Sequence, residues 1–387
     1  MSMSFVKNER QQRIYDQLNQ FIPQFRKRAP LHDEEGSFPF DNIEDLKSMG
    51  YPTFTLPAEY GGKELSLYEF VLFQEQIARG DGATALSIGW HVGITMDLAE
   101  KRPWSDEMLD FLFKEISKGA LINTAATEPK TGSPTRGGKP ETTARKTADG
   151  WVINGHKTFT SMSVALDYIF VTATIDETEE VGQFIIPKDA KGVSIEETWD
   201  LIGMRGTASH DLILEDVEIP SHYLTQVLSA PQKKKPSGWL LHIPACYMGI
   251  ALAARDYAVQ FANDYSPNSL PGPIRELPTI QQAIGEIELE LLNARHFMYS
   301  VAQKWDESSD RTQLGAELGA AKHVVTNTAV RVVDRAMRIV GAKSLQQSNP
   351  MQRYYRDVRA GLHNPPMDDM TIANLAANAF KELEDDQ

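Results

Sequence analysis

The spacing of hydrophobic residues divides the chain into three regions, and the first, residues 1–120, has the pattern of helices. Apolar side chains recur there at intervals of three and four residues, which places them on one face of a helix. A later helical stretch is interrupted by the sequence GDG at 80–82, so we expect one helix to end there and another to begin. The apolar positions that define the first helix are Ile14, Leu18, Phe21 and Ile22.

The middle region, residues 121–225, consists of short segments rich in β-branched and aromatic residues, separated by turn-forming residues. Such segments predict β-strands joined by close turns. Asp-Gly at 149–150 is expected to precede one strand and Asn-Gly at 154–155 to turn into the next, while the segment 198–204 (TWDLIGM) is expected to form another strand. The region therefore predicts a small β-barrel or sandwich.

The last region, residues 226–387, returns to helical spacing. Its segment 241–264 is apolar almost all round, which is typical of a helix buried in the centre of a bundle. A later helix is expected to end at Gly341. The whole chain thus predicts an α+β multidomain protein, with an N-terminal helical domain, a middle β domain and a C-terminal four-helix bundle. The expected domains are 1–120, 121–225 and 226–387.

The composition narrows the range of partners. Hydrophobic residues make up 41% and charged residues 24% of the chain, as in an ordinary globular protein. The net charge of −14 disfavours nucleic acid and anionic membranes as main partners. One basic run, Lys233–Lys235, lies among Pro and Ser residues, and we expect it to form a solvated loop.

The single cysteine, Cys246, excludes an internal disulfide and is typical of a reducing compartment. It lies in an apolar stretch without metal-ligand spacing, so we expect burial and no metal site. The N-terminal segment carries charges from the start and has no apolar core of signal-peptide length. No stretch of about 18 uncharged apolar residues occurs. These features predict a cytoplasmic protein.

Two segments carry groups that could bind a polar ring or a phosphate. The segment 123–138 (NTAATEPKTGSPTRGG) offers hydroxyl and backbone N–H groups, although surface turns select the same residues. The segment 153–163 (INGHKTFTSMS) places Phe159 beside the hydroxyls of Thr160 and Ser161, which is also common in ordinary strands. Neither segment is specific by itself.

A third segment, 199–220 (WDLIGMRGTASHDLILEDVEIP), is a glycine-rich crossing followed by a strand, and alone it is only a strand connection. In this order, between two helical regions, the three segments resemble the acyl-CoA dehydrogenase family. EYGG and EQIARGDGATAL match the N-terminal domain of that family, and TEPKTGS its flavin- and thioester-contacting loop. INGHKTFTS is similar to its flavin strand, and GMRGTAS with LEDVEIP to the end of its β domain. RIVGAKS with YYRDVR is similar to its last FAD-contacting helix and the following segment. The resemblance covers nearly the whole chain.

The resemblance implies an FAD-dependent acyl-CoA dehydrogenase, which desaturates an acyl-CoA thioester between its α and β carbons. It also implies an electron-transferring flavoprotein as acceptor and a homotetramer, or a dimer, as the assembly. The cofactor would supply the hydride chemistry, while the protein tunes it by hydrogen bonds to N1 and N5.

The resemblance also assigns cofactor-binding roles to individual positions. Thr127 would donate to the pyrimidine side of the flavin, Phe159 would pack on the isoalloxazine face, and Ser161 would bond near N5. Ser133 would lie where flavin and pantetheine approach each other, and the end of the last long helix would reach the FAD of a neighbouring subunit. The full set is Thr124, Ala126, Thr127, Ser133, Phe159, Thr160, Ser161, Arg338, Ile339 and Gly341.

Two elements of the family pattern are absent. The base that removes the α-proton is usually a glutamate beyond the tyrosine of YRD, and this position is Pro365. Some members place it at the start of the central helix, where this chain has Trp239 and Leu240. The Arg-x-x-Phe-Gly element that grips FAD across the subunit boundary is expected at 266–275, but that segment reads SPNSLPGPIR and Arg275 is displaced.

The loop 360–370 (AGLHNPPMDDM) offers other candidates for proton transfer. If its two prolines are an insertion, Met367 takes the glutamate position and Asp368 follows it. Asp368 or Asp369 could then supply the carboxylate, and His363 an imidazole of suitable pKa. Alternatively, one of the aspartates only caps the final helix.

His363 also raises a second function. Flavin monooxygenases of this fold lack the glutamate and often have a histidine in this loop, which helps to stabilise an oxygen adduct or orients the substrate. A third alternative is a flavin- or acyl-binding homologue without catalysis. The YRD and TEPKTGS motifs favour the dehydrogenase, and the absent glutamate favours the other two.

Overall fold

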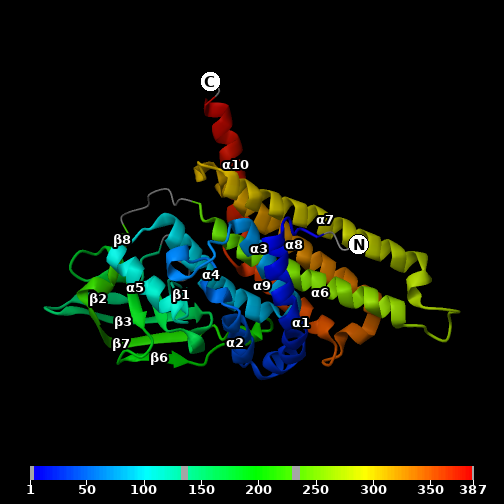
Figure 1. Ribbon diagram of the computed structural model, residues 1–387, viewed down its shortest axis with the longest axis horizontal. Coiled ribbons are helices and arrows are strands. Elements are labelled where there is room, and N and C mark those ends of the chain that lie inside the picture. Colours follow the sequence, from blue (N-terminus) through cyan, green and yellow to red (C-terminus); the bar gives the residue numbers. More distant parts are fainter. Residues whose placement is uncertain (1–3, 132–137, 229–235, 386–387) are drawn as a thin grey trace.

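The computed structural model describes residues 4–131, 138–228 and 236–385. Helices come first, then a sheet, then a bundle of long helices. The sheet lies at one end of the molecule, and the long helices extend to the other end (Figure 1). The predicted fold class is confirmed. Ser133 and the basic run Lys233–Lys235 fall outside the described residues.

The N-terminal helices pack against one another and against the C-terminal bundle. Helix α3 begins with a capping box, in which Ser66 and Glu69 each accept the backbone N–H of the other. The break predicted at GDG is confirmed, because α3 ends at Gly80 and Asp81 caps α4 by accepting the N–H of Thr84 over 3.0 Å. The helices are α1 (Glu9–Glu35), α2 (Phe40–Ser48), α3 (Leu67–Gly80), α4 (Gly82–Lys101) and α5 (Asp106–Ser117).

The middle domain is a sheet with the strand order β6-β7-β3-β2-β4-β5-β8, and β1 pairs with β4 in parallel. Because β6 and β8 stand at opposite ends of this order, the sheet is open. Helix α5 covers part of it, with Leu112 and Phe113 packed against Phe170 and Ile185. The strands are β1 (Ile122–Ala125), β2 (Thr143–Lys146), β3 (Gly150–Thr160), β4 (Tyr168–Ile175), β5 (Val181–Pro187), β6 (Val193–Glu196), β7 (His210–Pro220) and β8 (Leu224–Leu228).

The turn predicted at Asn154-Gly155 is wrong, because β3 continues through these residues and forms a bulge opposite β7. A Cβ at Gly155 would lie 2.3 Å from Oγ1 of Thr142, so the glycine serves close packing. The Asn154 side chain exchanges hydrogen bonds of 3.0 and 2.8 Å with Asp216 on β7. An Asn-Gly pair that signals a turn can thus equally signal a bulge.

The strand predicted at 198–204 is also wrong. This segment leads from β6 toward β7 along α9 (Pro350–Ala360), and a Cβ at Gly203 would lie 2.4 Å from the backbone oxygen of Arg356. The N–H of Met204 donates to Asp357 on the same helix. The segment is therefore held by the C-terminal bundle and not by a strand ladder.

The C-terminal bundle is built around α6, which is buried along most of its length, including Cys246. Gly249 lets α6 approach α3 closely, since a Cβ there would lie 2.3 Å from the carbonyl oxygen of Glu75. Helix α8 ends at Gly341, as predicted, with φ +68°. The helices are α6 (His242–Asp264), α7 (Pro278–Glu307), α8 (Gly315–Val340), α9 and α10 (Asp368–Asp385).

The last helix, α10, projects away from the bundle (Figure 1). None of the helices in the described ranges combines the length and apolar character needed to cross a membrane.

Candidate functional site

The two segments expected to bind a cofactor lie side by side in the sheet domain. Thr127 and Thr158 form an antiparallel β-bridge, in which the N–H of Thr158 donates to the carbonyl of Thr127 over 2.8 Å. The Asn123 side chain also crosses between the segments and donates to the carbonyl of Ser161 over 2.8 Å. We call the segments 124–127 and 158–161 the β1–β3 edge.

The β1–β3 edge presents hydroxyl groups that are free to bond a ligand. Thr124 and Thr127 are half-buried, and neither side chain has a hydrogen-bond partner among the described residues. Oγ1 of Thr160 is buried and likewise unpaired within that part of the chain. Ala126, which is also half-buried, lies between the two threonines in the sequence and has a small side chain. A buried hydroxyl without a partner costs stability unless water or a ligand satisfies it, so this edge fits the polar rim of a flat ring.

Phe159 is the large aromatic residue of this edge, and its ring is 59% exposed. Its backbone has φ +58°, a conformation that is unfavourable for a residue with a Cβ. The ring touches Trp199 edge-on, with centroids 5.8 Å apart. An exposed aromatic side chain on strained backbone is typical of a ligand site, because strain persists where function requires it.

A chain of hydroxyl groups continues from Ser161 into the bundle-facing side of the domain. The Oγ atoms of Ser161 and Ser209 lie 2.8 Å apart, and Oγ1 of Thr207 lies 2.8 Å from Ser209 and donates to the carbonyl of Met204. Ser209 and Thr207 orient the Ser161 hydroxyl, and both were missed by the sequence analysis. The run of small hydroxyl residues in GMRGTAS is the signal that could have identified them.

Three more residues with positive φ lie next to these hydroxyl groups, namely Met162 (φ +63°), Met204 (φ +54°) and Ala208 (φ +43°). The N–H of Met162 donates to the carbonyl of Thr207 over 2.8 Å, so the two strained segments hold each other. The N–H of Met204 donates to Asp357 over 2.7 Å. Burial raises the pKa of the Asp357 carboxyl to about 7, although the Met204 bond and the charge of Arg353 act the other way.

A buried ion pair joins the two segments of the β1–β3 edge, because Glu128 directly follows the first segment and Lys157 directly precedes the second. Nζ of Lys157 lies 2.6 Å from Oε1 of Glu128 and donates to the carbonyl of Thr172. Burial alone would raise the pKa of Glu128, but bonds from Lys157, Thr142 and the backbone N–H of Glu141 lower it to about 2. Because Glu128 and Lys157 also form hydrogen bonds with Thr142 and Thr172, this ion pair holds the two segments of the edge in register.

The loop after α9 carries the residues expected to move protons. His363 is exposed in the short 3-10 turn Gly361–His363. The next residue, Asn364, accepts a hydrogen bond of 2.5 Å from the hydroxyl of Tyr247 on α6. Gly361 packs on the same tyrosine, since a Cβ there would lie 2.7 Å from its ring. The loop is thus fixed to the central helix while the imidazole faces outward.

Asp368 is the first residue of α10, and its carboxylate faces α8. Oδ2 accepts a hydrogen bond of 2.9 Å from Asn327, and Oδ1 lies 3.1 Å from Nδ1 of His323 and 3.6 Å from Nζ of Lys322. Burial alone would raise the pKa of Asp368, but the bonds from Asn327 and His323 and the Lys322 charge lower it. Asp369 follows in the first turn of the helix, where a negative charge is favourable.

Comparison with known proteins gives the same order of domains. Family models of the acyl-CoA dehydrogenase N-terminal, middle and C-terminal domains match residues 8–101, 123–217 and 241–364. The chain belongs to the acyl-CoA dehydrogenase family. It is 55% identical to the "Putative acyl-CoA dehydrogenase YdbM" of Bacillus subtilis (strain 168), over 97% of this chain and 99% of that protein.

Solved structures similar to this acyl-CoA dehydrogenase family member include proteins with different names. KijD3 in complex with FMN and a dTDP-linked amino keto sugar superposes with a TM-score of 0.85, at 25% identity over 97% of this chain and 95% of that chain. Butyryl-CoA dehydrogenase from Megasphaera elsdenii has a TM-score of 0.85 at 21% identity, over 98% of this chain and all of its own (100%). The second likeness concerns the fold alone.

An apolar cavity of about 190 Å³ adjoins the loop that precedes Asp368, and Pro365 and Pro366 of this loop line it. Lys322, whose side chain is buried, contributes the charged group in its wall, and burial lowers the pKa of that ammonium although Asp368 acts the other way. The apolar lining comes from Leu240, Leu241, Leu318, Pro365, Pro366 and Met370. Pro365 and Leu240, which stand at the usual positions of the family's glutamate, therefore wall the same cavity.

Trp239, at the other alternative position, fills the interior instead. Its ring stacks on His242 and meets Trp90 of α4 edge-on. Gly93 makes room for it, because a Cβ there would lie 2.4 Å from the Trp239 ring. Nε1 of Trp90 and Nε2 of His242 are buried without partners in the described ranges, and burial lowers the pKa of His242 to about 4. This aromatic cluster was not predicted, and its signal was the pair Gly89 and Gly93 on a buried helix.

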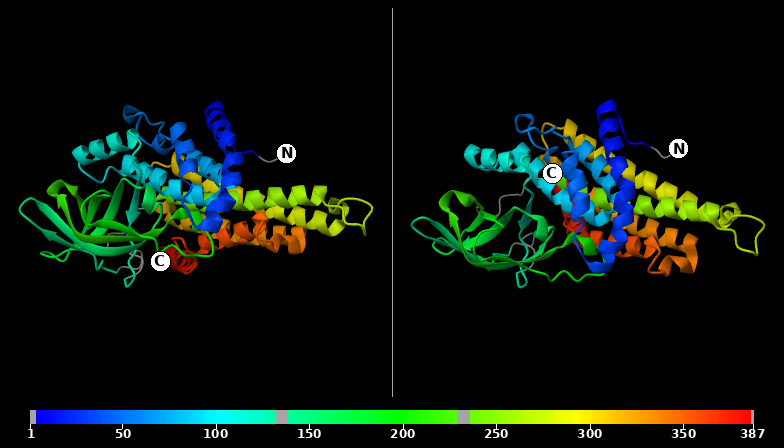
Figure 2. Two further views of the ribbon diagram at one scale, coloured as in Figure 1. Left: turned by 90° about the horizontal axis from the view of Figure 1, so that it is seen from below. Right: turned by 60° about the horizontal axis from the view of Figure 1, so that its bottom comes forward.

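The residues expected to reach a neighbouring subunit lie far from the β1–β3 edge. The end of α8 is on the opposite side of the bundle from the sheet in every view (Figures 1 and 2). Arg338 is exposed there and pairs with Asp334 over 2.9 Å, Ile339 is buried, and Gly341 has open space around it. The structure does not bring them together with the β1–β3 edge of the same chain. Arg275 is exposed and bonds to Asn263.

Proposed function

We propose that this protein is an FAD-dependent dehydrogenase that desaturates an acyl-CoA thioester between its α and β carbons. The observation that carries the proposal is the β1–β3 edge, where unpaired hydroxyls stand beside the exposed Phe159. The flavin, when bound, supplies the hydride acceptor. Thr124, Ala126 and Thr127 would hold its pyrimidine side, and Ser133, which lies outside the described residues, would contact the flavin where the pantetheine chain approaches it.

The remaining residues of the edge would hold and orient the ring. Phe159 would cover one face of the flavin ring. The buried hydroxyl of Thr160 would form a hydrogen bond with the ring or with the side chain of the flavin, and Ser161 would donate a hydrogen bond near the reacting nitrogen. The contact between Ser161 and Ser209 fixes the direction of that hydroxyl. Because the hydroxyls are positioned by strained but hydrogen-bonded backbone, little rearrangement is needed on binding, which favours tight flavin retention.

Asp368 is our candidate for the group that accepts the α-proton. It directly follows the loop whose prolines line the apolar cavity, and its lowered pKa keeps it ionised at neutral pH, which is the form that accepts a proton. The cavity would take the acyl chain, since an apolar lining with one charged group is typical of a substrate site. Lys322 and Asn327 hold the carboxylate in one orientation.

The test compares Asp368→Asn with Asp369→Asn. Asp369 is the adjacent exposed aspartate of the same helix turn, so it controls for the charge change and for any effect on α10. Loss of a positioned base commonly slows the step by about 10²–10⁴-fold. We expect this loss of acyl-CoA-dependent flavin reduction for Asp368→Asn only, with flavin content unchanged in both. Equal rates in both variants would remove Asp368 from the mechanism.

A second candidate is a flavin-dependent monooxygenase of the same fold. A base of lowered pKa is weaker than one tuned toward neutrality, and the pKa of Asp368 is lowered. His363 is exposed at the same loop and therefore accessible to a ligand. KijD3, which shares the fold, was crystallised with FMN and a sugar nucleotide.

His363→Ala separates the two candidates. In a monooxygenase this variant increases hydrogen peroxide release when reduced flavin and oxygen are supplied, because the oxidation of substrate is uncoupled. In a dehydrogenase that uses Asp368 it changes the rate of flavin reduction only modestly. A protein in which neither substitution alters any flavin-linked turnover would be a non-catalytic binding homologue.

We further propose a homotetramer or dimer in which the end of α8 reaches the cofactor of a neighbouring subunit. Arg338 and Ile339 are in the last turn of α8 and Gly341 follows it, and this end of the helix lies away from the sheet of the same chain (Figures 1 and 2). An electron-transferring flavoprotein would be the physiological acceptor. A monomer that retains its full flavin content would contradict the assembly.

A further inference from the structure

A tyrosine of the central helix holds the loop between α9 and α10 at two points. Tyr247 of α6 is fully buried, and its hydroxyl donates a hydrogen bond of 2.5 Å to Oδ1 of Asn364. Gly361 lies against the ring of the same tyrosine, because a Cβ at that glycine would lie 2.7 Å from its Cδ2. His363 stands between these two anchored residues in the sequence. The position of the His363 backbone therefore depends on Tyr247.

The bond to Asn364 is the main polar tie of this loop. Among the described residues, no other side-chain hydrogen bond involves positions 361–366. The exposed imidazole of His363 has no hydrogen bond or ion pair with that part of the chain. Asp368, in contrast, is held separately by Asn327 and His323 of α8. Of the two candidates for proton transfer, His363 is thus the one whose position depends on the loop.

The residues around Asn364 make the loop stiff once this side chain is held. A residue that precedes proline is restricted to extended backbone, and Asn364 has φ −78° and ψ 148°. The rings of Pro365 and Pro366 restrict their own φ angles as well. An anchor at the Asn364 side chain therefore restricts the path of the chain from the 3-10 turn Gly361–His363 to the start of α10.

The Tyr247 hydroxyl remains a donor throughout the neutral pH range. Burial raises the pKa of the Tyr247 phenol well above its ordinary value, and the nearby Cys246 and Asp357 act in the same direction. The Asn364 amide, its acceptor, does not titrate. The contact is therefore a constant constraint on the loop and not a pH-dependent one.

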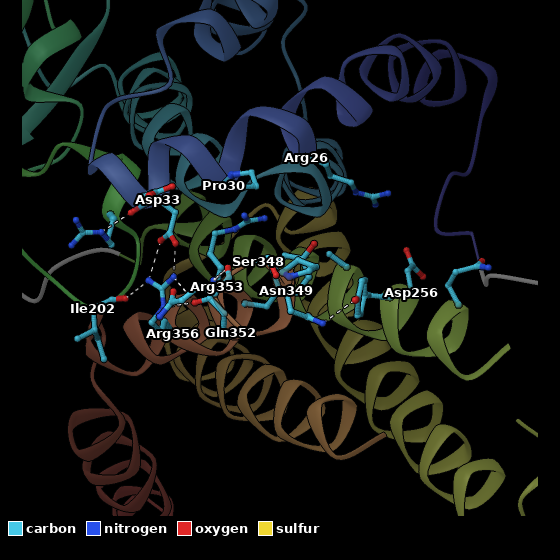
Figure 3. A pocket seen from close by; sticks show the side chains of 18 residues that line it. Arg26, Pro30, Asp33, Ile202, Asp256, Ser348, Asn349, Gln352, Arg353 and Arg356 are labelled. Atoms are coloured by element: carbon cyan, nitrogen blue, oxygen red, sulfur yellow. Dashed lines mark hydrogen bonds and ion pairs between the residues drawn. The ribbon is translucent and has the colours of Figure 1, made fainter. Parts of the chain in front are cut away.

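A second tyrosine of α6 makes a similar contact that does not involve the loop. The hydroxyl of Tyr257 accepts a hydrogen bond of 2.9 Å from Asn349, the N-cap of α9. Figure 3 shows Asn349 at the N-terminal end of α9, in a pocket that is also lined by α1 and α6. Tyr247 and Tyr257 thus hold the two ends of α9 to the same helix, and Tyr257 provides a matched control for Tyr247.

We propose that Tyr247 is a positioning residue, whose hydroxyl holds the loop 361–364 so that the His363 imidazole keeps one location at the reaction site. The proposal rests on the proposed function, because His363 acts only if this loop adjoins the flavin and the substrate. Tyr247 itself is buried, so it acts through His363 and not on the substrate.

The experiment compares Tyr247→Phe with Tyr257→Phe in the full-length, flavin-loaded protein. Each variant removes one hydroxyl from α6 and keeps the aromatic ring, so the packing of Tyr247 on Gly361 is retained. A neutral hydrogen bond shifts a local equilibrium by about 2–10-fold. We therefore expect amide hydrogen exchange of residues 361–364 to be about 2–10-fold faster in Tyr247→Phe and unchanged in Tyr257→Phe.

Turnover of an established substrate tests whether the contact acts through His363. Tyr247→Phe should change turnover in the same direction as His363→Ala, either by slower flavin reduction or by greater release of hydrogen peroxide. The double variant should behave as His363→Ala alone, because residues that act through one another are not additive. Tyr257→Phe should behave as wild type, and the flavin content should be the same in all variants.

Equal exchange in Tyr247→Phe and wild type would overturn the proposal, as would effects of Tyr247→Phe and His363→Ala that add. If His363→Ala alters no turnover, the proposed role of His363 fails and that of Tyr247 with it, although faster exchange would still show that the contact holds the loop. Asn364→Ala removes the acceptor of the same bond. It should give the same exchange and the same turnover, and it decides the question if Tyr247→Phe does not fold.

Discussion

The carboxylate of Asp357 accepts a hydrogen bond of 2.7 Å from the backbone N–H of Met204, and this contact ties α9 to the strained turn of the β domain. Met204 leads directly into the hydroxyl chain that ends at Ser161. The position of the Ser161 hydroxyl therefore depends on a carboxylate of another domain. That carboxylate is fully buried, and burial raises its pKa to about 7.

We predict that Asp357→Asn changes the pH dependence of stability. The carboxyl has a higher pKa in the folded protein than in the unfolded chain, so the folded form binds more protons between about pH 4 and pH 7. Stability from this group is therefore lost as pH rises through 7. Asparagine can accept the same N–H without a charge. Urea unfolding at pH 5, 6.5 and 8 should show that the free energy of unfolding of the variant increases relative to that of wild type, by on the order of 1–4 kcal/mol, as pH rises. A difference that stays constant with pH would contradict the assignment.

Phe159→Gly should separate stability from cofactor binding. Glycine relieves a backbone strain of about 1 kcal/mol or more at φ +58°, so the flavin-free variant should be at least as stable as wild type. Loss of the ring should weaken flavin binding by about tenfold, since an aromatic contact is worth about 0.5–1.5 kcal/mol beyond its buried area. Thermal unfolding and flavin fluorescence titration measure the two effects.

Glu64→Gly is the matched control for that variant. Glu64 is exposed in a loop and has φ +49°, so it carries similar strain away from the β1–β3 edge. It should gain stability without any change in flavin affinity. A gain of affinity in Phe159→Gly would show that the ring obstructs the site.

Lys157→Met should destabilise the sheet domain strongly. Removal of one partner from a buried ion pair commonly costs about 3–5 kcal/mol, because the other charge stays buried and unpaired. Lys139→Met is the control, since the Lys139–Glu179 pair is exposed and such pairs contribute about 0–1 kcal/mol. Chemical denaturation of both variants tests the difference. Similar values for the two lysines would show that Glu128 finds other partners.

The parts of the fold that follow from local rules could be predicted from the sequence. The break at GDG and the helix end at Gly341 depend on caps and on glycine backbone, which neighbouring residues determine. Asn154-Gly155 failed because the same dipeptide also permits a bulge packed against Thr142. The strand expected at 198–204 failed because its backbone bonds to α9, which is distant in sequence.

The residues of the candidate site were also predictable only in part. The motifs identified the β1–β3 edge, but not Ser209 and Thr207, because their role depends on a contact with Ser161 that only the folded chain creates. The loop at 360–370 indicated Asp368, but not its partners on α8, which lower its pKa instead of raising it. A carboxylate can be located from sequence, whereas its proton affinity is set by tertiary contacts.

Arg338→Ala tests the proposed contact between subunits. The exposed pair with Asp334 contributes less than about 1 kcal/mol, so folding of the subunit should be unaffected. Flavin retention during gel filtration should fall if Arg338 reaches a neighbour's cofactor, while Arg331→Ala, an exposed change on the same helix, should leave it intact. Full retention in Arg338→Ala would remove that arginine from the cofactor site.

Anaerobic mixing of the purified, flavin-loaded protein with a panel of acyl-CoA thioesters tests the central claim most directly. The proposed function predicts that at least one straight, branched or aryl-substituted acyl-CoA bleaches the oxidised flavin in a saturable reaction and yields the enoyl-CoA. Asp368→Asn should slow that phase by about 10²–10⁴-fold. A protein whose flavin no acyl-CoA reduces, but which consumes oxygen when a reductase supplies reduced flavin, would contradict the dehydrogenase.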